Sequence, residues 1–376
     1  MRIEPSVPEE ALAAIRAALA RADARPITAP ILLPLNLLLD LAGEAMRARL
    51  FVVQAEGGAE ECLRPDFTVA VARAHIEGGA AEGRYAYEGP AFRASPDGDR
   101  PDQFIQLGVE TFTGSNTARA ESDAEIAALA WRASLAGGRS DLTLWLGDVG
   151  LFSALIDSLS LPAPLAARLK RVAGRPRLLN AELARAGEPP AASGDGQLAA
   201  MLAGLSEPAA SALLEEVWAL AGVEPVGGRG PTEIAQRLVR RAEAAGAPSL
   251  TPSQAQAIAD FMAISEAPRD GLSKVRALAG TGVIIDAALD DWERRLGALH
   301  GAVSQDRLRF TPALGHAFDY YDGLTFEVRS DALGAERAVA TGGRYDGLLE
   351  RLGGRPGGGA VGCVVRPWRA FSGGES

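Results

Sequence analysis

An amide and a carboxylate lie close together in a segment that otherwise has the composition of a β-strand. In QFIQLGVETF, Gln106 and Glu110 share one strand face with Gly108 between them, while the residues next to them are apolar. Such a face can accept hydrogen bonds from an ammonium group, and the glycine leaves room for a ligand above it. The solvent-facing side of an ordinary two-faced sheet would show the same pattern, so both interpretations remain open.

A second candidate stretch is GHAFDYYDGLTFEV, residues 315–328. Asp322-Gly323 predicts a two-residue hairpin turn, because both residues tolerate the positive φ that a type I′ turn needs. This hairpin would place Asp319 and Tyr321 on one face with apolar neighbours. A carboxylate on an apolar face needs a partner, so we expect Asp319 to meet polar residues from elsewhere in the chain.

Other polar residues are also embedded in strand-like sequence, namely Arg64 and Asp66 in CLRPDFT, Arg93 in GPAFRAS, and Arg344, Tyr345 and Asp346 in TGGRYDG. No metal or nucleophile motif accompanies them. The three histidines, His75, His300 and His316, are not at ligand spacing. The glycine-rich GGRPGGGAVG lacks the Gly-Lys-Ser/Thr of a phosphate loop and predicts a loop before a buried strand. We therefore expect no metal, no cofactor and no catalytic residue.

The composition is that of a globular protein without a nucleic-acid surface. The chain has 376 residues, of which 47% are hydrophobic and 23% charged, and its formal net charge is −10. No block of Lys and Arg offers a phosphate-binding face. The N-terminal segment lacks the features of a signal peptide, and the longest apolar run, around residues 27–43, is broken by two prolines. These features predict a cytoplasmic protein with Cys62 and Cys363 reduced and buried.

The candidate residues require a sheet to bring them together. Residues 1 to about 160 predict a helix over 9–23, strands around 51–53, 84–87, 104–112 and 142–150, and a helix that begins at Ser122 with Glu125 as its capping-box partner. Long connections between the strands favour an antiparallel sheet with helices laid on it. Strand signals return after residue 307.

The middle of the chain predicts helices. Apolar residues recur at helical spacing in three stripes, Leu198, Met201, Leu202 and Leu205, then Leu213, Val217 and Leu220, then Leu289, Trp292, Leu296 and Leu299. Such stripes are typical of packing faces rather than of cofactor sites.

The order of the motifs is more specific than any one of them. LRPDFT, YEGPAFR, QFIQLGVETF, FDYYDGLTFEV and TGGRYDGLLERLGG, in this order, resemble the catalytic core of the histidyl branch of class II aminoacyl-tRNA synthetases. The resemblance implies an α+β fold, with an antiparallel sheet flanked by helices. It also implies a first core segment at 1–163, a helical insertion at 164–302 and a second core segment at 303–376.

The resemblance implies a histidine-binding site on the face of that sheet. Asp66, Gln106 and Glu110 would hold the amino end of the amino acid, and Arg93 would lie at its carboxylate. Tyr321 and Tyr345 would contact the imidazole ring, with Asp319 beside them.

Three positions depart from the synthetase motifs. The glutamate of the Arg-x-Glu that clamps ATP is Ser95 here, and the arginine of the second histidine signature is His316. Arg366 replaces the small glycine of Gly-Leu-Glu-Arg, where adenine would approach. Because the given sequence continues only to Ser376, we also expect no anticodon-binding domain. The amino-acid half of the site is thus kept, while the ATP half is expected to be lost.

This pattern resembles the regulatory-subunit family of ATP phosphoribosyltransferase, which acts in the first step of L-histidine biosynthesis. The resemblance implies a non-catalytic protein, a homodimer within a hetero-oligomer, that pairs with a short-form catalytic subunit and mediates feedback inhibition by L-histidine. It implies no nucleic-acid or membrane partner. Two alternatives remain open, a truncated synthetase-like enzyme that activates an amino acid for a non-tRNA acceptor, and a sensor of tRNA or amino acids.

Overall fold

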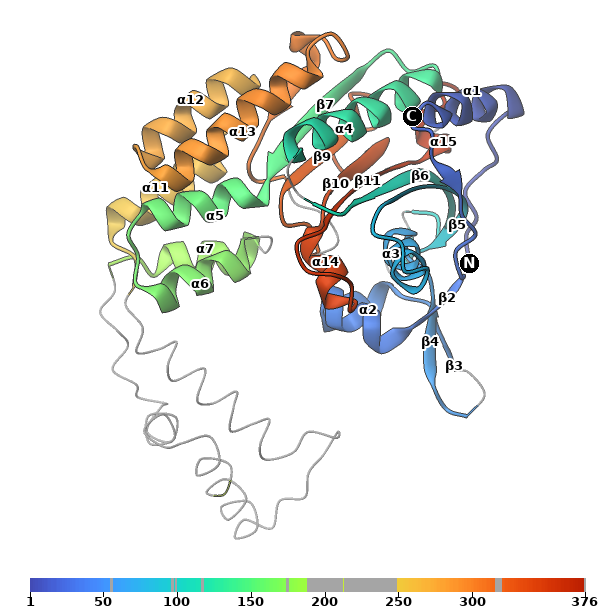
Figure 1. Ribbon diagram of the computed structural model, residues 1–376, viewed down its shortest axis with the longest axis horizontal. Coiled ribbons are helices and arrows are strands. Elements are labelled where there is room, and N and C mark those ends of the chain that lie inside the picture. Colours follow the sequence, from blue (N-terminus) through green and yellow to red (C-terminus); the bar gives the residue numbers. More distant parts are fainter. Residues whose placement is uncertain are drawn as a thin grey trace. The chain divides into compact units, whose positions relative to one another are not determined.

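The computed structural model describes residues 1–54, 57–95, 98, 100–115, 118–173, 176–187, 212, 249–314 and 320–374. The chain forms two compact units. The first comprises Met1–Ser158 and Asp260–Ser376, and the second comprises Leu159–Ala259. Figure 1 shows the course of the chain through both.

An eight-stranded sheet forms the centre of the first unit (Figure 1). In spatial order its strands are β1 (Arg25–Pro26), β5 (Gly83–Phe92), β6 (Gln103–Thr113), β11 (Gly359–Val365), β10 (Ala340–Arg344), β9 (Leu324–Ser330), β7 (Leu142–Asp148) and β8 (Leu308–Phe310). Neighbouring strands are antiparallel, except that the two edge strands β1 and β8 run parallel to β5 and β7. The sheet and the helices on it confirm the predicted α+β fold.

The two faces of the sheet differ in polarity because side chains alternate along each strand. On β6, Leu107 and Val109 belong to the buried apolar core. Gln106 and Glu110 point to the opposite face, where Glu110 lies opposite Tyr85 of β5 and Gly362 of β11. Gln106 and Glu110 are only 2% and 1% exposed, so this polar face is not the solvent-facing side of an ordinary sheet.

Helices cover the sheet of the first unit. They are α1 (Glu9–Ala20), α2 (Leu35–Ala42), α3 (Thr68–Glu77), α4 (Arg119–Ala136), α5 (Val149–Ser158), α12 (Pro268–Ala279), α13 (Val283–Leu299), α14 (Asp346–Arg351) and α15 (Pro367–Ala370), with 3-10 helices η1 (Glu44–Arg49) and η2 (Gln305–Arg307). The long helix α4 packs on β9, β10 and β11 (Figure 1). Its buried side is largely alanine, and this lets the helix lie close to the strands.

A small sheet and two helices build the wall beside the polar face. The small sheet has the order β2 (Leu32–Pro34), β4 (Glu60–Leu63) and β3 (Val52–Gln54). Its Leu33 and Cys62 join the apolar cluster that holds α2 and α3. Phe67, just before α3, stacks on Tyr87 of β5 with ring centroids 4.4 Å apart. This packing fixes the start of α3 against the main sheet.

The described part of the second unit is helical, as expected for the middle of the chain. It contains α6 (Ala163–Val172), α7 (Pro176–Ala184) and the first turns of α11 (Pro252–Met262). Leu165, Leu169 and Leu179 are buried in it. The predicted stripes at 198–205 and 213–220 lie outside the described residues.

The third predicted stripe is confirmed, and it belongs to the first unit. Leu289, Trp292 and Leu299 are buried on α13, which packs on α4 and α5. The chain therefore rejoins the sheet unit at Asp260, although the sequence predicted an insertion over 164–302. As a division into domains, the segments 1–163, 164–302 and 303–376 stay a prediction.

The predicted helix start at Ser122 is wrong. Helix α4 begins at Arg119, so Ser122 lies inside its first turn and does not cap it. The Ser122 hydroxyl donates to the Arg119 carbonyl and accepts from Arg344 Nη2 at 2.6 Å. Glu125 binds Arg84 instead of the backbone. Both side chains bind residues that are distant in the sequence, so the predicted capping box does not form.

The predicted hairpin at Asp322-Gly323 is also wrong. Strand β9 pairs with β10 on one side and β7 on the other, so neither of its edges is open to residues 320–322. The Asp322 carboxylate instead accepts hydrogen bonds from the backbone N–H groups of Asp346 and Gly347, at the start of α14. Asp322, which predicted a turn in the sequence, therefore stabilises the start of α14.

The prediction that both cysteines are reduced and buried is confirmed, since Cys62 and Cys363 are free and buried. Among the helices that the structure describes, none is long and apolar enough to cross a bilayer.

Candidate functional site

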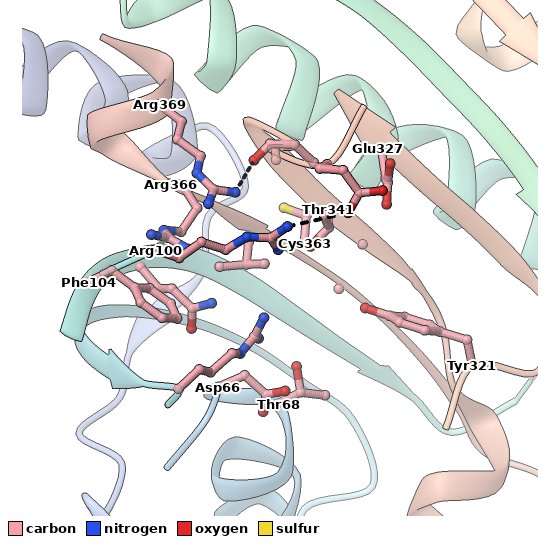
Figure 2. Close-up of a pocket in the computed structure, with 18 of the residues that line it drawn as sticks. Asp66, Thr68, Arg100, Phe104, Tyr321, Glu327, Thr341, Cys363, Arg366 and Arg369 are labelled. Carbon is pink, nitrogen blue, oxygen red and sulfur yellow. Dashed lines mark hydrogen bonds and ion pairs between the residues drawn. The ribbon is translucent and has the colours of Figure 1, made fainter. Parts of the chain in front are cut away.

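A cavity of about 590 Å³ opens on the polar face of the main sheet (Figure 2). It collects six of the seven residues predicted to bind histidine, namely Asp66, Arg93, Gln106, Glu110, Tyr321 and Tyr345. Two of the three departing positions, Ser95 and Arg366, also line it. Asp319 and His316 lie outside the described residues.

Several parts of the first unit supply the side chains of the cavity. Asp66 and Thr68 come from the start of α3, and Gln106 and Glu110 from β6. The tyrosines come from the segment before β9 and from the junction between β10 and α14. At Gly362 of β11, any Cβ would overlap the Glu110 carboxylate. The glycine thus gives this carboxylate its space on the sheet.

Three hydroxyl groups hold the Glu110 carboxylate. Tyr345 donates to Oε2 at 2.5 Å, and Thr68 and Tyr87 donate to Oε1 at 2.8 and 3.3 Å. Burial raises the pKa of Glu110 to about 7, against the opposing effect of these hydrogen bonds. Glu110 therefore titrates close to neutral pH, and both of its oxygens already have partners.

Asp66 and Gln106 differ from Glu110, because each has a buried oxygen with no hydrogen-bond donor among the described residues. These atoms are Asp66 Oδ1 and Gln106 Oε1. The other Asp66 oxygen accepts from the Tyr320 hydroxyl at 3.3 Å. A buried acceptor without a donor is costly, at about 1–3 kcal/mol. A ligand that brings N–H donors into the cavity would supply what these oxygens lack.

An aromatic group lines the cavity next to Glu110. The ring of Tyr321 lies 4.8 Å from that of Tyr320 and 6.4 Å from that of Tyr345, measured between centroids. Burial raises the pKa of the Tyr321 hydroxyl above its usual range, so this phenol stays neutral. The group offers a flat, apolar wall with a few polar tips, which suits a small aromatic ring.

Arginines line another part of the cavity. Arg49, Arg93, Arg100, Arg366 and Arg369 contribute to its wall. Figure 2 shows Arg100, Arg366 and Arg369 near Phe104, apart from Tyr321. The Arg93 Nε donates to the Pro65 carbonyl at 2.9 Å, which orients its guanidinium beside Asp66. The Coulomb attraction of Arg93 opposes the effect of burial, which raises the pKa of Asp66.

Sequence reasoning missed several lining residues and included others that lie elsewhere. Thr68, two residues after Asp66, and Tyr320, next to Tyr321, could have been found from their neighbours. Arg49 and Arg100 carry no local signal. Arg64 does not line the cavity, because its guanidinium binds the carbonyls of Ala29, Pro30 and Pro90.

Arg344 and Asp346 also lie outside the cavity lining. Arg344 donates to Asp346 at 2.9 Å and to Asp123 of α4 at 2.7 Å. These contacts stabilise the packing of α4 on the sheet.

Comparison with known proteins shows which family the chain resembles. The model of the histidyl-tRNA synthetase family matches residues 8–223 and 232–366. An ATP phosphoribosyltransferase regulatory subunit of Mesorhizobium japonicum is 37% identical over 84% of both chains. One from Brucella anthropi is 32% identical over 90% of both.

The chain belongs to the ATP phosphoribosyltransferase regulatory subunit family. This family shares the fold of the histidyl-tRNA synthetases, as the matching family model shows.

Solved structures confirm the fold of this family member. A protein from Bacillus halodurans, described as an ATP phosphoribosyltransferase regulatory subunit/histidyl-tRNA synthetase, superposes with a TM-score of 0.66 at 20% identity, over 99% of this chain and 81% of that one. Histidyl-tRNA synthetase from Nostoc superposes with a TM-score of 0.60 at 16% identity, over 99% and 75%. At these identities the likeness concerns the fold.

Proposed function

We propose that this chain is a non-catalytic regulatory subunit of ATP phosphoribosyltransferase that binds L-histidine in the cavity of the main sheet. It activates a short-form catalytic subunit in the first step of histidine biosynthesis and transmits feedback inhibition. Family membership supports the role as a regulatory subunit. Histidine binding in the cavity is supported by two buried oxygens that have no donor among the described residues, Asp66 Oδ1 and Gln106 Oε1, in a cavity that also holds a guanidinium and an aromatic wall.

The contacts suggest a role for each side chain toward histidine. Asp66 and Gln106 accept hydrogen bonds from the ammonium group, which has three donors, and Arg93 pairs with the carboxylate. Tyr321 and Tyr345 lie along the imidazole ring. Glu110 was expected at the ammonium group. Its carboxylate oxygens already accept hydrogen bonds from the hydroxyl groups of Tyr345, Thr68 and Tyr87, so we assign Glu110 to the ring end of the ligand.

The loss of synthetase residues supports a role without chemistry. Ser95 has no carboxylate to clamp ATP, and its backbone N–H donates to Asp102 at 3.3 Å. The guanidinium of Arg366 lies 3.6 Å from the centroid of the Phe104 ring, which fills the space where a planar group could stack. We therefore expect no histidine-dependent exchange of pyrophosphate into ATP. Measurable exchange would favour the truncated-enzyme alternative instead.

Isothermal titration calorimetry with L-histidine tests the binding site. Asp66→Asn keeps the shape of the side chain and removes its charge, and Gln106→Ala removes the second acceptor. Each should weaken binding by about tenfold or more, because a hydrogen bond to a charged group is lost. Glu110→Ala should also weaken it, through loss of the ring contact.

The control is Glu88→Gln on β5. Glu88 binds Arg16 at the surface and does not line the cavity, so its variant should bind histidine like the parent chain. No histidine binding by the parent chain, or binding untouched by the cavity variants, would sink the site assignment.

Reconstitution tests the regulatory role. Phosphoribosyltransferase activity of a short-form catalytic subunit would be measured alone, with this chain, and with added histidine. We expect activation by the chain and inhibition by histidine. The coupling must be reciprocal, so substrates that favour the active state should weaken histidine binding. Absence of both activation and histidine sensitivity would contradict the proposal.

A further inference from the structure

A buried histidine of α3 lies outside the cavity and packs on the main sheet. His75 is only 5% exposed, and its imidazole ring stacks on Phe112 of β6 with ring centroids 4.3 Å apart. Its Nδ1 lies 2.9 Å from the hydroxyl oxygen of Tyr85 on β5. Neither His75 nor Tyr85 lines the cavity, so the proposed function leaves this contact without a role.

The same Tyr85 hydroxyl accepts a hydrogen bond from Arg25 of the edge strand β1, at 2.5 Å. The Arg25 guanidinium also lies over the Tyr85 ring, 4.5 Å from its centroid. Arg25 and Tyr85 are partners in the register of β1 and β5, and the next bond is from the Ile27 N–H to the Ala86 carbonyl, at 2.9 Å. Because β1 has only two residues, both exposed, its backbone pairing is short and the side-chain contact adds to what holds it.

The donors and acceptors of these three side chains determine where the protons lie. A guanidinium can only donate, so the Tyr85 oxygen is the acceptor for Arg25. The single proton of the Tyr85 hydroxyl then points to His75, and Nδ1 accepts it. This arrangement needs the neutral imidazole with its own proton on Nε2. The series from Arg25 through Tyr85 to His75 is therefore complete only while His75 is uncharged.

Protonation of His75 would break this series. Nδ1 would become a donor aimed at an oxygen that already accepts from Arg25, and the Tyr85 hydroxyl proton would lose its acceptor. Burial lowers the pKa of His75 from its ordinary value of 6.5, and the charge of Arg25 lowers it further. A proton on the imidazole thus favours a state in which the guanidinium has moved away.

The other surroundings of His75 contribute no carboxylate that would offset a positive charge on its ring. β6 contributes the apolar ring of Phe112. On α3 itself, Arg73 and Glu77 pair with each other at 3.2 Å, both with exposed side chains. Among the described residues, the tyrosine of β5 and the arginine of β1 are the titratable or charged groups that act on the imidazole.

We infer that His75, Tyr85 and Arg25 form a pH-sensitive latch, which holds the edge strand β1 on the main sheet at neutral pH and releases it in mild acid. β1 lies between α1 and β2 of the small sheet, so its release would loosen the link from that helix to the wall beside the cavity. Release would also uncover the edge of β5, whose backbone groups could then pair with another strand. The inference does not depend on histidine binding.

Nitrogen-15 NMR of the histidine side chains in the parent chain tests the proton positions without any variant. We expect the His75 ring to carry its proton on Nε2 at neutral pH, and to titrate below the usual histidine value of about 6.5. A ring protonated on Nδ1 at neutral pH, or a titration at or above that value, would overturn the inference.

Hydrogen exchange of the Ile27 amide reports on the latch, because this N–H pairs with Ala86 of β5. Its protection factor would be measured at about pH 5 and about pH 7.5. The reference is the Val339 amide, which donates to the Val328 carbonyl of β9 at 2.8 Å. We expect acid to reduce the protection of Ile27 severalfold more than that of Val339. An equal reduction at both amides would reflect a global loss of stability and would contradict the latch.

Three variants identify the titrating group, and thermal melts show whether each one folds. His75→Gln keeps an acceptor for Tyr85 but does not titrate, so the protection of Ile27 relative to the reference should no longer change with pH. Tyr85→Phe should leave Ile27 weakly protected at both pH values. His300→Gln replaces an exposed histidine at the end of α13 and should behave like the parent chain. An acid-induced loss of Ile27 protection that persists in His75→Gln would overturn the inference, and the titration of the parent chain decides it where a variant does not fold.

Discussion

Glu110 is the residue whose surroundings most directly set a pH dependence. Its pKa is raised to about 7 in the folded chain by burial, from an ordinary value of 4.5. Between these two values the folded state binds more protons than the unfolded state, so stability must fall as pH rises through this window. Above pH 7 Glu110 is ionised in both the folded and the unfolded state, so its effect on stability no longer changes with pH.

Replacing Glu110 with glutamine should remove that slope. Urea unfolding of the parent chain and of Glu110→Gln would be compared at several pH values between 4.5 and 8. We expect the unfolding free energy of Glu110→Gln, relative to that of the parent chain, to increase by up to about 3 kcal/mol as pH rises. The slope is the diagnostic, because the amide also loses an acceptor for Tyr345 at every pH. Parallel curves would show that Glu110 is not the titrating group.

At the scale of elements, a buried ion network holds α4, α13 and β10 together. Asp123 of α4 is fully buried and binds Arg344 of β10 at 2.7 Å and Arg295 of α13 at 2.7 Å. Asp148, at the end of β7, accepts from the Trp292 indole N–H at 2.9 Å. Asp123 is thus shared by two guanidiniums, and its loss would leave both buried without their common partner.

Asp123→Ala should therefore lower the free energy of unfolding by about 3–5 kcal/mol, as expected when one member of a buried ion pair is removed. Urea denaturation measures this loss. The matched control is Glu125→Ala on the same helix, whose pair with Arg84 is partly exposed and should cost about 1 kcal/mol or less. Equal losses for the two variants would show that the network does not hold α4 as described.

At the scale of the whole molecule, the cavity is confined to one unit. All of its lining residues lie in Met1–Ser158 or Asp260–Ser376. If histidine binds there, it should slow amide hydrogen exchange in β6, β10 and β11. Helices α6 and α7 belong to the second unit and should exchange at unchanged rates. Hydrogen exchange with and without saturating histidine measures both, and protection confined to α6 and α7 would place the ligand elsewhere.

The elements that were predicted well are those with a strong local pattern. The alternation of polar and apolar residues in QFIQLGVETF and the stripe over 289–299 both survive in β6 and α13, because residue spacing alone decides which side chains share a face. The helix start predicted at Ser122 and the turn predicted at Asp322 were wrong because they depend on contacts between residues far apart in the sequence. Their side chains had better partners in Arg344 and in the start of α14, and no local pattern contains those partners.

The sequence by itself determined the fold class and six of the residues that line the cavity, since ordered motifs and strand alternation are local properties of the chain. Only the tertiary structure decided which polar atoms are satisfied. It gave Glu110 three hydroxyl partners, left Asp66 Oδ1 and Gln106 Oε1 without a donor among the described residues, and brought Glu4 to Arg366. Hydrogen bonding and charge compensation depend on distances between residues far apart in the chain, and sequence spacing does not encode these distances.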